Sequence, residues 1–136
     1  MKKILILDDN FEILLLYKTL VTHMGFVVKT STRGDEALRW LDDEHFDLIL
    51  TDMKMPVMGG IEFVRSAREK GVTSKVIIIT AFPTMADANQ LSKLNIYSCL
   101  IKPVLLTKLE EIVRKALEDP APDPAVQGGT AAPANA

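Results

Sequence analysis

The sequence predicts an α/β domain, a doubly wound five-stranded parallel sheet with five helices, and three observations lead to this fold class. Short apolar runs alternate five times with segments of helical character, which is typical of a parallel sheet with helices on both faces. Three of the runs, at residues 4–7, 46–51 and 76–79, are almost continuously apolar, as strands buried on both sides are. The chain has 136 residues, a normal size for one domain with a substantial core.

The composition is that of an ordinary soluble protein. Apolar residues make up 48% of the chain and the net charge is −2, so the sequence predicts no direct nucleic-acid binding and no membrane association. No apolar run approaches the length of a membrane span. The N-terminus resembles a first strand more than a signal peptide, because Asp8 and Asp9 follow only four apolar residues. The single cysteine, Cys99, precludes an internal disulfide, and a cytoplasmic protein is expected.

The predicted elements follow one another in strict alternation. The strands are expected at residues 4–7, 26–30, 46–51, 76–79 and 97–101. The helices are expected at residues 11–23, 35–41, 61–70, 84–94 and from 106 to about 118. The second strand contains Lys29 and Thr30 and suits an edge, whereas the β-branched run at 76–79 suits the centre. Right-handed crossovers then favour the flavodoxin-like strand order 2-1-3-4-5.

Polar residues mark several of the predicted helix ends. Asn10 is expected to cap the first helix and Gly25 to end it. Ser31 or Thr32 is expected to cap the second helix. The pattern from Thr107 to Glu110 is a capping box that opens or reinforces the last helix.

The C-terminal segment, residues 119–136, is rich in proline and alanine and has no apolar periodicity. It is expected to be a disordered tail or a linker, which leaves residues 1–118 as the only folded domain. The sequence leaves open whether the chain acts alone or is part of a longer protein.

Chemically active side chains follow four of the predicted strands. They are Asp8 and Asp9 after the first, Asp52 after the third, Thr80 after the fourth and Lys102 after the fifth. The carboxyl ends of parallel strands share one edge of the sheet, where ligands bind in open α/β folds. The repulsion between two carboxylates about 4 Å apart is roughly 4 kcal/mol at an effective dielectric constant of about 20. A bound proton or cation must therefore offset this repulsion. Oxygen ligands with an open face suit Mg²⁺ and phosphoryl chemistry, in which a carboxylate can be the nucleophile.

These strand-end residues, with the loop Asp52-Met53-Lys54-Met55-Pro56-Val57-Met58-Gly59-Gly60, resemble the receiver domain of two-component response regulators over about residues 2–118. The resemblance implies that Asp52 accepts a phosphoryl group from a phosphohistidine of a sensor histidine kinase or histidine phosphotransfer protein. It implies that Thr80 and Lys102 bind this group and relay its presence to a downstream protein target. It also implies a Mg²⁺ ion and a cis bond between Lys102 and Pro103. The implied metal ligands are Asp8, Asp9, Asp52 and the backbone carbonyl of Lys54.

The sequence departs from the family pattern at Cys99, which occupies the position of the usual switch aromatic. Tyr97 lies two residues earlier and is expected to share a strand face with Cys99, and so to replace the aromatic in part. The family often forms dimers through the surface that contains this position, and the sequence leaves open a phosphorylation-dependent dimer here.

The first helix is apolar around most of its circumference, because Ile13, Leu14, Leu15 and Leu16 are consecutive. A helix that packs on a sheet needs only one apolar stripe. We therefore expect Leu14 or Leu15 to be exposed, where it would dock a partner's helix. His23 and His45 are expected at the surface.

Three alternatives were weighed against a phosphoacceptor domain. A haloacid-dehalogenase-like phosphatase also forms an aspartyl phosphate, but it needs Asp-x-Asp after the first strand, and Asp8-Asp9-Asn10 lacks that arrangement. A flavodoxin needs a Ser/Thr/Gly-rich phosphate loop there instead of two acids. A receiver-like docking module that is never phosphorylated stays open at this point. The favoured reading is a domain that catalyses its own phosphorylation and dephosphorylation and is not a metabolic enzyme.

Overall fold

The computed structural model describes residues 1–81 and 83–118, which contain one sheet of five parallel strands. The strands are β1 (Lys3–Leu7), β2 (Val27–Ser31), β3 (Leu48–Asp52), β4 (Lys75–Thr80) and β5 (Ser98–Ile101). Their order is β2-β1-β3-β4-β5, which confirms the predicted flavodoxin-like fold. The predicted tail, residues 119–136, lies outside the described residues.

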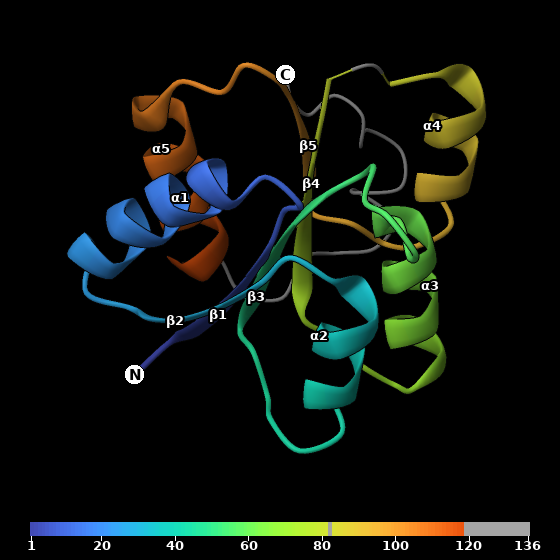
Figure 1. Cartoon of the computed structure of the whole chain (residues 1–136), viewed down its shortest axis with the longest axis horizontal. Coiled ribbons are helices and arrows are strands. Elements are labelled where there is room, and N and C mark those ends of the chain that lie inside the picture. Colours follow the sequence, from blue (N-terminus) through green and yellow to red (C-terminus); the bar gives the residue numbers. More distant parts are fainter. Residues whose placement is uncertain (82, 119–136) are drawn as a thin grey trace.

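The helices cover both faces of this sheet. They are α1 (Phe11–His23), α2 (Gly34–Trp40), α3 (Gly60–Glu69), α4 (Met85–Leu91) and α5 (Leu106–Glu118). Figure 1 shows α1 and α5 on one side of the sheet and α2, α3 and α4 on the other. Alternate residues of β1 belong to the two buried clusters, Ile6 to the α1/α5 side and Leu7 to the other. This two-sided burial explains the continuous apolar runs. No helix among the described residues is long and apolar enough to span a membrane.

The termini of α1 are as predicted, but the predicted cap of α2 is wrong. Asn10 accepts hydrogen bonds from the backbone N–H groups of Glu12 and Ile13 at 3.0 and 3.1 Å. The N-cap of α2 is Arg33, without a side-chain cap, because the helix begins at Gly34. The backbone of Gly34 passes so close to the loop after β3 that a Cβ atom there would lie 3.2 Å from the Met58 carbonyl oxygen.

The segment around α4 differs most from the prediction. The helix ends at Leu91 rather than 94, and a capping box formed by Thr84 and Asp87, which the sequence reading missed, begins it. Asn95 follows with a positive φ of 61°. The last helix starts at Leu106, so Thr107 lies within its first turn and not before it.

The prediction that Tyr97 and Cys99 share a face is wrong. Cys99 packs against the cluster on the α2/α3 side, whereas Tyr97 packs against the cluster on the α1/α5 side. The physical reason is that β5 begins only at Ser98, so the alternation of a pleated strand does not extend back to Tyr97. Tyr97 also lies just before β5, at the opposite end of the strand from Lys102, and therefore does not occupy the place of the switch aromatic.

The exposure of α1 agrees with the prediction. Leu14 is buried with 3% of its surface exposed, whereas Leu15 is 52% exposed. His23 and His45 are both exposed, as expected. The apolar character of α1 is therefore divided between a buried stripe and an outward-facing one.

Candidate functional site

The functional side chains predicted from the strand ends all lie on one rim of the sheet. Asp8 follows β1, Asp52 ends β3, Thr80 ends β4 and Lys102 follows β5. The strand register aligns these ends, because Leu7 pairs with Thr51, Asp52 with Ile79 and Thr80 with Ile101. Residues separated by up to 94 positions in the sequence are therefore in direct contact.

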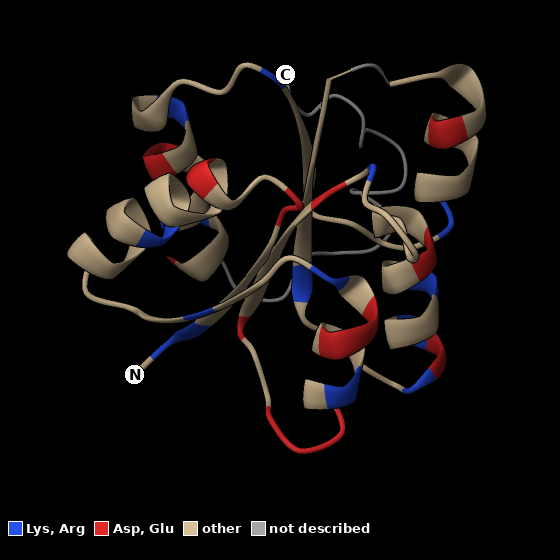
Figure 2. Ribbon diagram, in the orientation of Figure 1, with Lys and Arg blue, Asp and Glu red and all other residues tan. Residues whose placement is uncertain are grey.

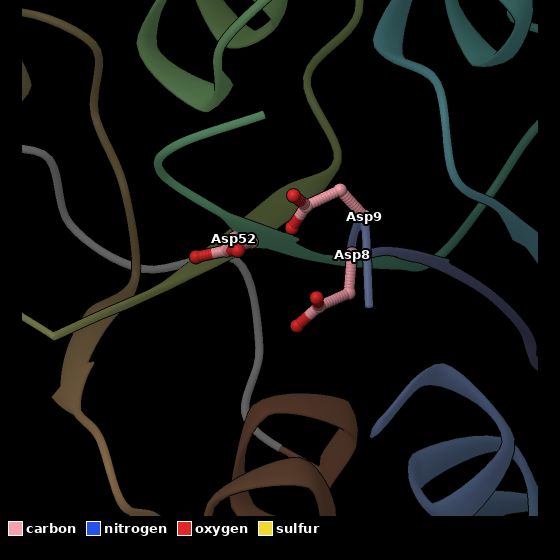
Figure 3. A group of neighbouring side chains, drawn as sticks. All are labelled: Asp8, Asp9 and Asp52. Carbon is pink, nitrogen blue, oxygen red and sulfur yellow. The ribbon is translucent and has the colours of Figure 1, made fainter. Parts of the chain in front are cut away.

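Three carboxylates converge at this rim. Figure 3 shows the side chains of Asp8, Asp9 and Asp52 gathered about a common point, and one oxygen of each lies within 4.8 Å of those of the other two. Asp8 and Asp52 are buried, whereas Asp9 is exposed. Three oxygen donors with an exposed side suit a hard divalent cation that keeps several waters, such as Mg²⁺.

Backbone groups hold one oxygen of each buried carboxylate. Asp8 Oδ1 accepts a hydrogen bond from Asn10 N–H at 2.8 Å, and Asp52 Oδ1 accepts one from Met53 N–H at 2.9 Å. The other oxygens, Asp8 Oδ2 and Asp52 Oδ2, lie 3.4 and 3.3 Å from Lys102 Nζ. A single ammonium group therefore serves two carboxylates, at distances longer than the roughly 2.7–2.9 Å of strong charge-assisted hydrogen bonds.

Burial and crowding shift the ionisation of this cluster. Burial, followed by the charge of Asp8, raises the pKa of Asp52, and Lys102 only partly opposes this shift. Burial alone would lower the pKa of Lys102, but the charges of Asp8 and Asp52 raise it above its ordinary value. Because the pKa of Asp52 is raised on folding, its contribution to stability is greatest at low pH and is lost as the pH rises through the folded-state pKa. When all of these groups are ionised, Lys102 balances only one of the negative charges of Asp8, Asp9 and Asp52.

The hydroxyl of Thr80 is the second unsatisfied group at the site. Thr80 is 1% exposed, and within the described residues its Oγ1 is the buried side-chain atom without a hydrogen-bond partner. A buried hydroxyl normally has a partner, and leaving one unpaired costs about 1–3 kcal/mol. Such a group at a strand end is poised to bind a ligand oxygen. The bond between Lys102 and Pro103 is cis, as expected.

The loop after β3 is packed tightly against the start of α3. Gly60 N–H donates to the Met53 carbonyl at 2.8 Å, and a Cβ atom at Gly60 would lie 2.3 Å from the Asp52 carbonyl oxygen. Only glycine allows this approach, which fixes the backbone of Asp52. Lys54 lies two residues beyond Asp52 in the same loop and is exposed, and the ligand role of its carbonyl stays a prediction.

Sequence reasoning missed one polar group near the site. Tyr17, on α1, lines an open cleft together with Lys102 and Ala81. No role was predicted from the sequence for Tyr17, which directly follows the run Leu14-Leu15-Leu16. The signal that could have found it is the helical spacing, which places position 17 on the buried stripe with Leu14 and Val21.

The doubly wound fold and the acidic rim define the class of signalling domains that carry a phosphoryl group on an aspartate, and comparison with known proteins agrees. The family model for the response regulator receiver domain matches residues 4–114. The transcriptional regulatory protein GlrR of Escherichia coli is 33% identical over 119 residues, which are 88% of this chain and 27% of GlrR. The chain thus spans about a quarter of the length of the first curated relatives that it matches.

Solved structures of receiver domains superpose closely on this chain. A CheY-like receiver domain protein from Methanospirillum hungatei has a TM-score of 0.81 at 27% identity and covers 87% of this chain and 94% of its own. The response regulator TrrA of Thermotoga maritima, solved in complex with Mg²⁺ and BeF, has a TM-score of 0.76 at 30% identity. The match covers 86% of this chain and 100% of the TrrA chain. The chain belongs to the response regulator receiver domain family, whose standard function is phosphoryl transfer to an aspartate.

The unpaired hydroxyl of Thr80 yields a testable prediction. Thr80→Val replaces the hydroxyl with a methyl group of similar shape and should raise the free energy of unfolding by about 1 kcal/mol in metal-free buffer, because no hydrogen bond is lost. The matched control is Thr51→Val, since Thr51 is equally buried but donates to the Asp52 carbonyl at 2.9 Å. This control should lose about 1 kcal/mol. Urea denaturation of both variants measures the difference, and equal losses would mean that Thr80 has a partner in solution.

Proposed function

We propose that this receiver domain spans residues 1–118 and that Asp52 is its phosphoacceptor. The convergence of Asp8, Asp9 and Asp52 beside one shared ammonium group is the observation that carries this proposal. Of the three acids, Asp52 is buried, accepts a hydrogen bond from the Met53 backbone N–H and lies 3.3 Å from Lys102, and its own backbone packs tightly against Gly60. Under the same proposal, residues 119–136 are a tail or a linker outside the receiver domain.

The transfer is a displacement at phosphorus. A carboxylate oxygen of Asp52 forms the new P–O bond while the P–N bond to the donor's histidine breaks, and its electron pair returns to the imidazole ring. Lys102 binds one oxygen of the arriving group, and the unpaired hydroxyl of Thr80 donates a hydrogen bond to another. The residues that would hold Mg²⁺ are Asp8, Asp9 and Asp52, with the carbonyl of Lys54. When bound, the ion would supply positive charge to offset the carboxylates and the transferred group.

The phosphorylated state differs from the free state chiefly in charge and hydrogen bonding. The added group brings about −1.5 to −2 charges to a rim that already holds three acids. Lys102 and Thr80 must therefore reorient, and Thr80 ends the strand that leads into α4. This reorientation is the local event that a downstream protein target detects. The same site later hydrolyses the acyl phosphate, which resets the switch in the cytoplasm.

The test of this function is the intact mass of the protein after incubation with acetyl phosphate and Mg²⁺. One added phosphoryl group is expected, absent when EDTA replaces the metal and absent in Asp52→Asn. The control variant is Asp43→Asn, which changes an exposed acid far from the rim and should be labelled like the wild type. Labelling that persists in Asp52→Asn would show that another residue is the phosphoacceptor. Absence of labelling in the wild type would contradict the proposed function.

We propose that the phosphodonor, a histidine kinase or histidine phosphotransfer protein, docks on the exposed side of α1. Phe11 and Leu15 lie one turn apart and are 68% and 52% exposed, and Leu105, just before α5, is 73% exposed. Figure 1 shows α1 beside α5. An outward apolar face beside the phosphoacceptor suits the apolar side of a partner's helix.

A single variant separates docking from chemistry. Leu15→Ala should leave labelling by acetyl phosphate unchanged, because Leu15 is 52% exposed and lies outside the buried stripe of α1. It should slow transfer from a phosphorylated histidine phosphotransfer protein about tenfold, as expected when an interface residue is truncated. Met85→Ala, at an 80% exposed position on α4, is the control and should leave both rates unchanged. Equal loss of both reactions in Leu15→Ala would assign it a structural role instead.

A further inference from the structure

An open cleft of about 410 Å³ adjoins the acidic rim on the side of α1. It lies between α1 and the segment that follows β5, and most of its lining is apolar. Its polar lining residues are Lys102, the ammonium group shared by Asp8 and Asp52, and Tyr17 of α1. The chain therefore places a phenol and the functional lysine against the same small volume.

The geometry of α1 directs Tyr17 toward the rim. The helix begins directly after Asp8, Asp9 and Asn10, so its N-terminal end lies at the site. Side chains on a helix lean toward its N-terminus, and a long side chain such as tyrosine reaches back over the preceding turn. The Tyr17 ring is buried, with 4% of the residue exposed, in the cluster between α1, α5 and the sheet.

The hydroxyl of Tyr17 is protonated and available. Burial raises its pKa first, Asp8 and Asp52 raise it further, and Lys102 lowers it, so the group senses the charges of the rim. Within residues 1–81 and 83–118 the Tyr17 hydroxyl has no hydrogen-bond partner, and it is not among the fully buried unpaired atoms. It therefore faces the cleft and has its hydrogen-bonding capacity free.

Lys102, in turn, is loosely held. Its ammonium group lies 3.3–3.4 Å from two carboxylate oxygens and its side chain is 22% exposed. A divalent cation held by the acids would compete with Lys102 for the charge of the same two carboxylates. Lys102 then needs another acceptor to stay in place until a phosphoryl group arrives, and the phenol oxygen across the cleft is an acceptor on a buried, rigid ring.

We propose that Tyr17 is a positioning residue for Lys102, accepting a hydrogen bond from its ammonium group once Asp8 and Asp52 are engaged by a divalent cation. The inference rests on the proposed function of Asp52 and adds a residue to it. Tyr17 does not touch the reacting atoms. It keeps the ammonium group aimed at the position of the incoming phosphoryl oxygen.

The kinetic test compares two conservative variants of the only two tyrosines. Tyr17→Phe keeps the buried ring and removes the hydroxyl, and it should lower the rate of labelling by acetyl phosphate at saturating Mg²⁺ about three- to tenfold, the effect of one lost hydrogen bond. Mg²⁺ affinity and thermal stability should stay unchanged. Tyr97→Phe, at the opposite end of the sheet, should react like the wild type.

A spectroscopic readout separates positioning from packing. With tyrosine labelled by ¹³C at Cζ, adding Mg²⁺ and beryllofluoride should shift the Tyr17 signal and leave that of Tyr97 in place. In Lys102→Met the Tyr17 shift should disappear, because the hydrogen-bond donor is gone. A Tyr17 shift that persists in Lys102→Met, or a wild-type labelling rate in Tyr17→Phe, overturns the proposal.

The outcomes also separate this inference from the function on which it rests. If wild type and Tyr97→Phe are labelled and Tyr17→Phe is labelled equally fast, only the role of Tyr17 fails. If the wild type itself is never labelled, the function of Asp52 fails and the role of Tyr17 fails with it.

Discussion

The structure depends on one electrostatic constraint, which is that two buried carboxylates share a single ammonium group. Asp8 and Asp52 are almost fully buried, Asp9 stands beside them, and Lys102 offers them one positive charge at 3.3–3.4 Å. Folding brings these groups together only because the sheet aligns the ends of β1, β3 and β5. The apolar strands therefore maintain an arrangement of charges that is unfavourable on its own. A bound cation or a phosphoryl group would change the net charge of this cluster.

The elements around the rim hold this arrangement in a narrow geometry. Asn10 caps α1, and its backbone N–H donates to one oxygen of Asp8, while the backbone N–H of Met53 donates to one oxygen of Asp52. The backbone of Gly60, at the start of α3, packs closely against the Asp52 carbonyl. Figure 2 shows acidic positions close together near the ends of β1 and β3, where Asp8, Asp9 and Asp52 form one group. Thr80 contributes an unpaired hydroxyl from β4. The ends of β1, β3, β4 and β5 thus present charged or polar groups that are crowded or without a partner, as expected of a site that binds an anionic group and its metal.

Much of this could be predicted from the sequence, because strand-end residues in a parallel sheet are fixed by local pattern and topology together. The positions of Asp8, Asp52, Thr80 and Lys102 follow from that rule. The start of α2 could not be predicted, because it depends on the close approach of Gly34 to Met58, a tertiary contact. The predicted face of Tyr97 was wrong for a similar reason, because β5 begins at Ser98, one residue later than the predicted strand. Tyr17 was missed because its role depends on a cleft formed by two distant segments.

The most direct test of the central constraint is thermal unfolding with and without millimolar Mg²⁺, at ionic strength matched by NaCl. Mg²⁺ should raise the Tm of the wild type by about 2–5 °C, because the metal binds only the folded cluster. Asp52→Asn should be more stable than the wild type without metal and should gain less from Mg²⁺, since one of the crowded charges is gone. A Mg²⁺ effect no larger than that of NaCl, with Asp52→Asn less stable than the wild type, would show that these carboxylates are not in electrostatic conflict.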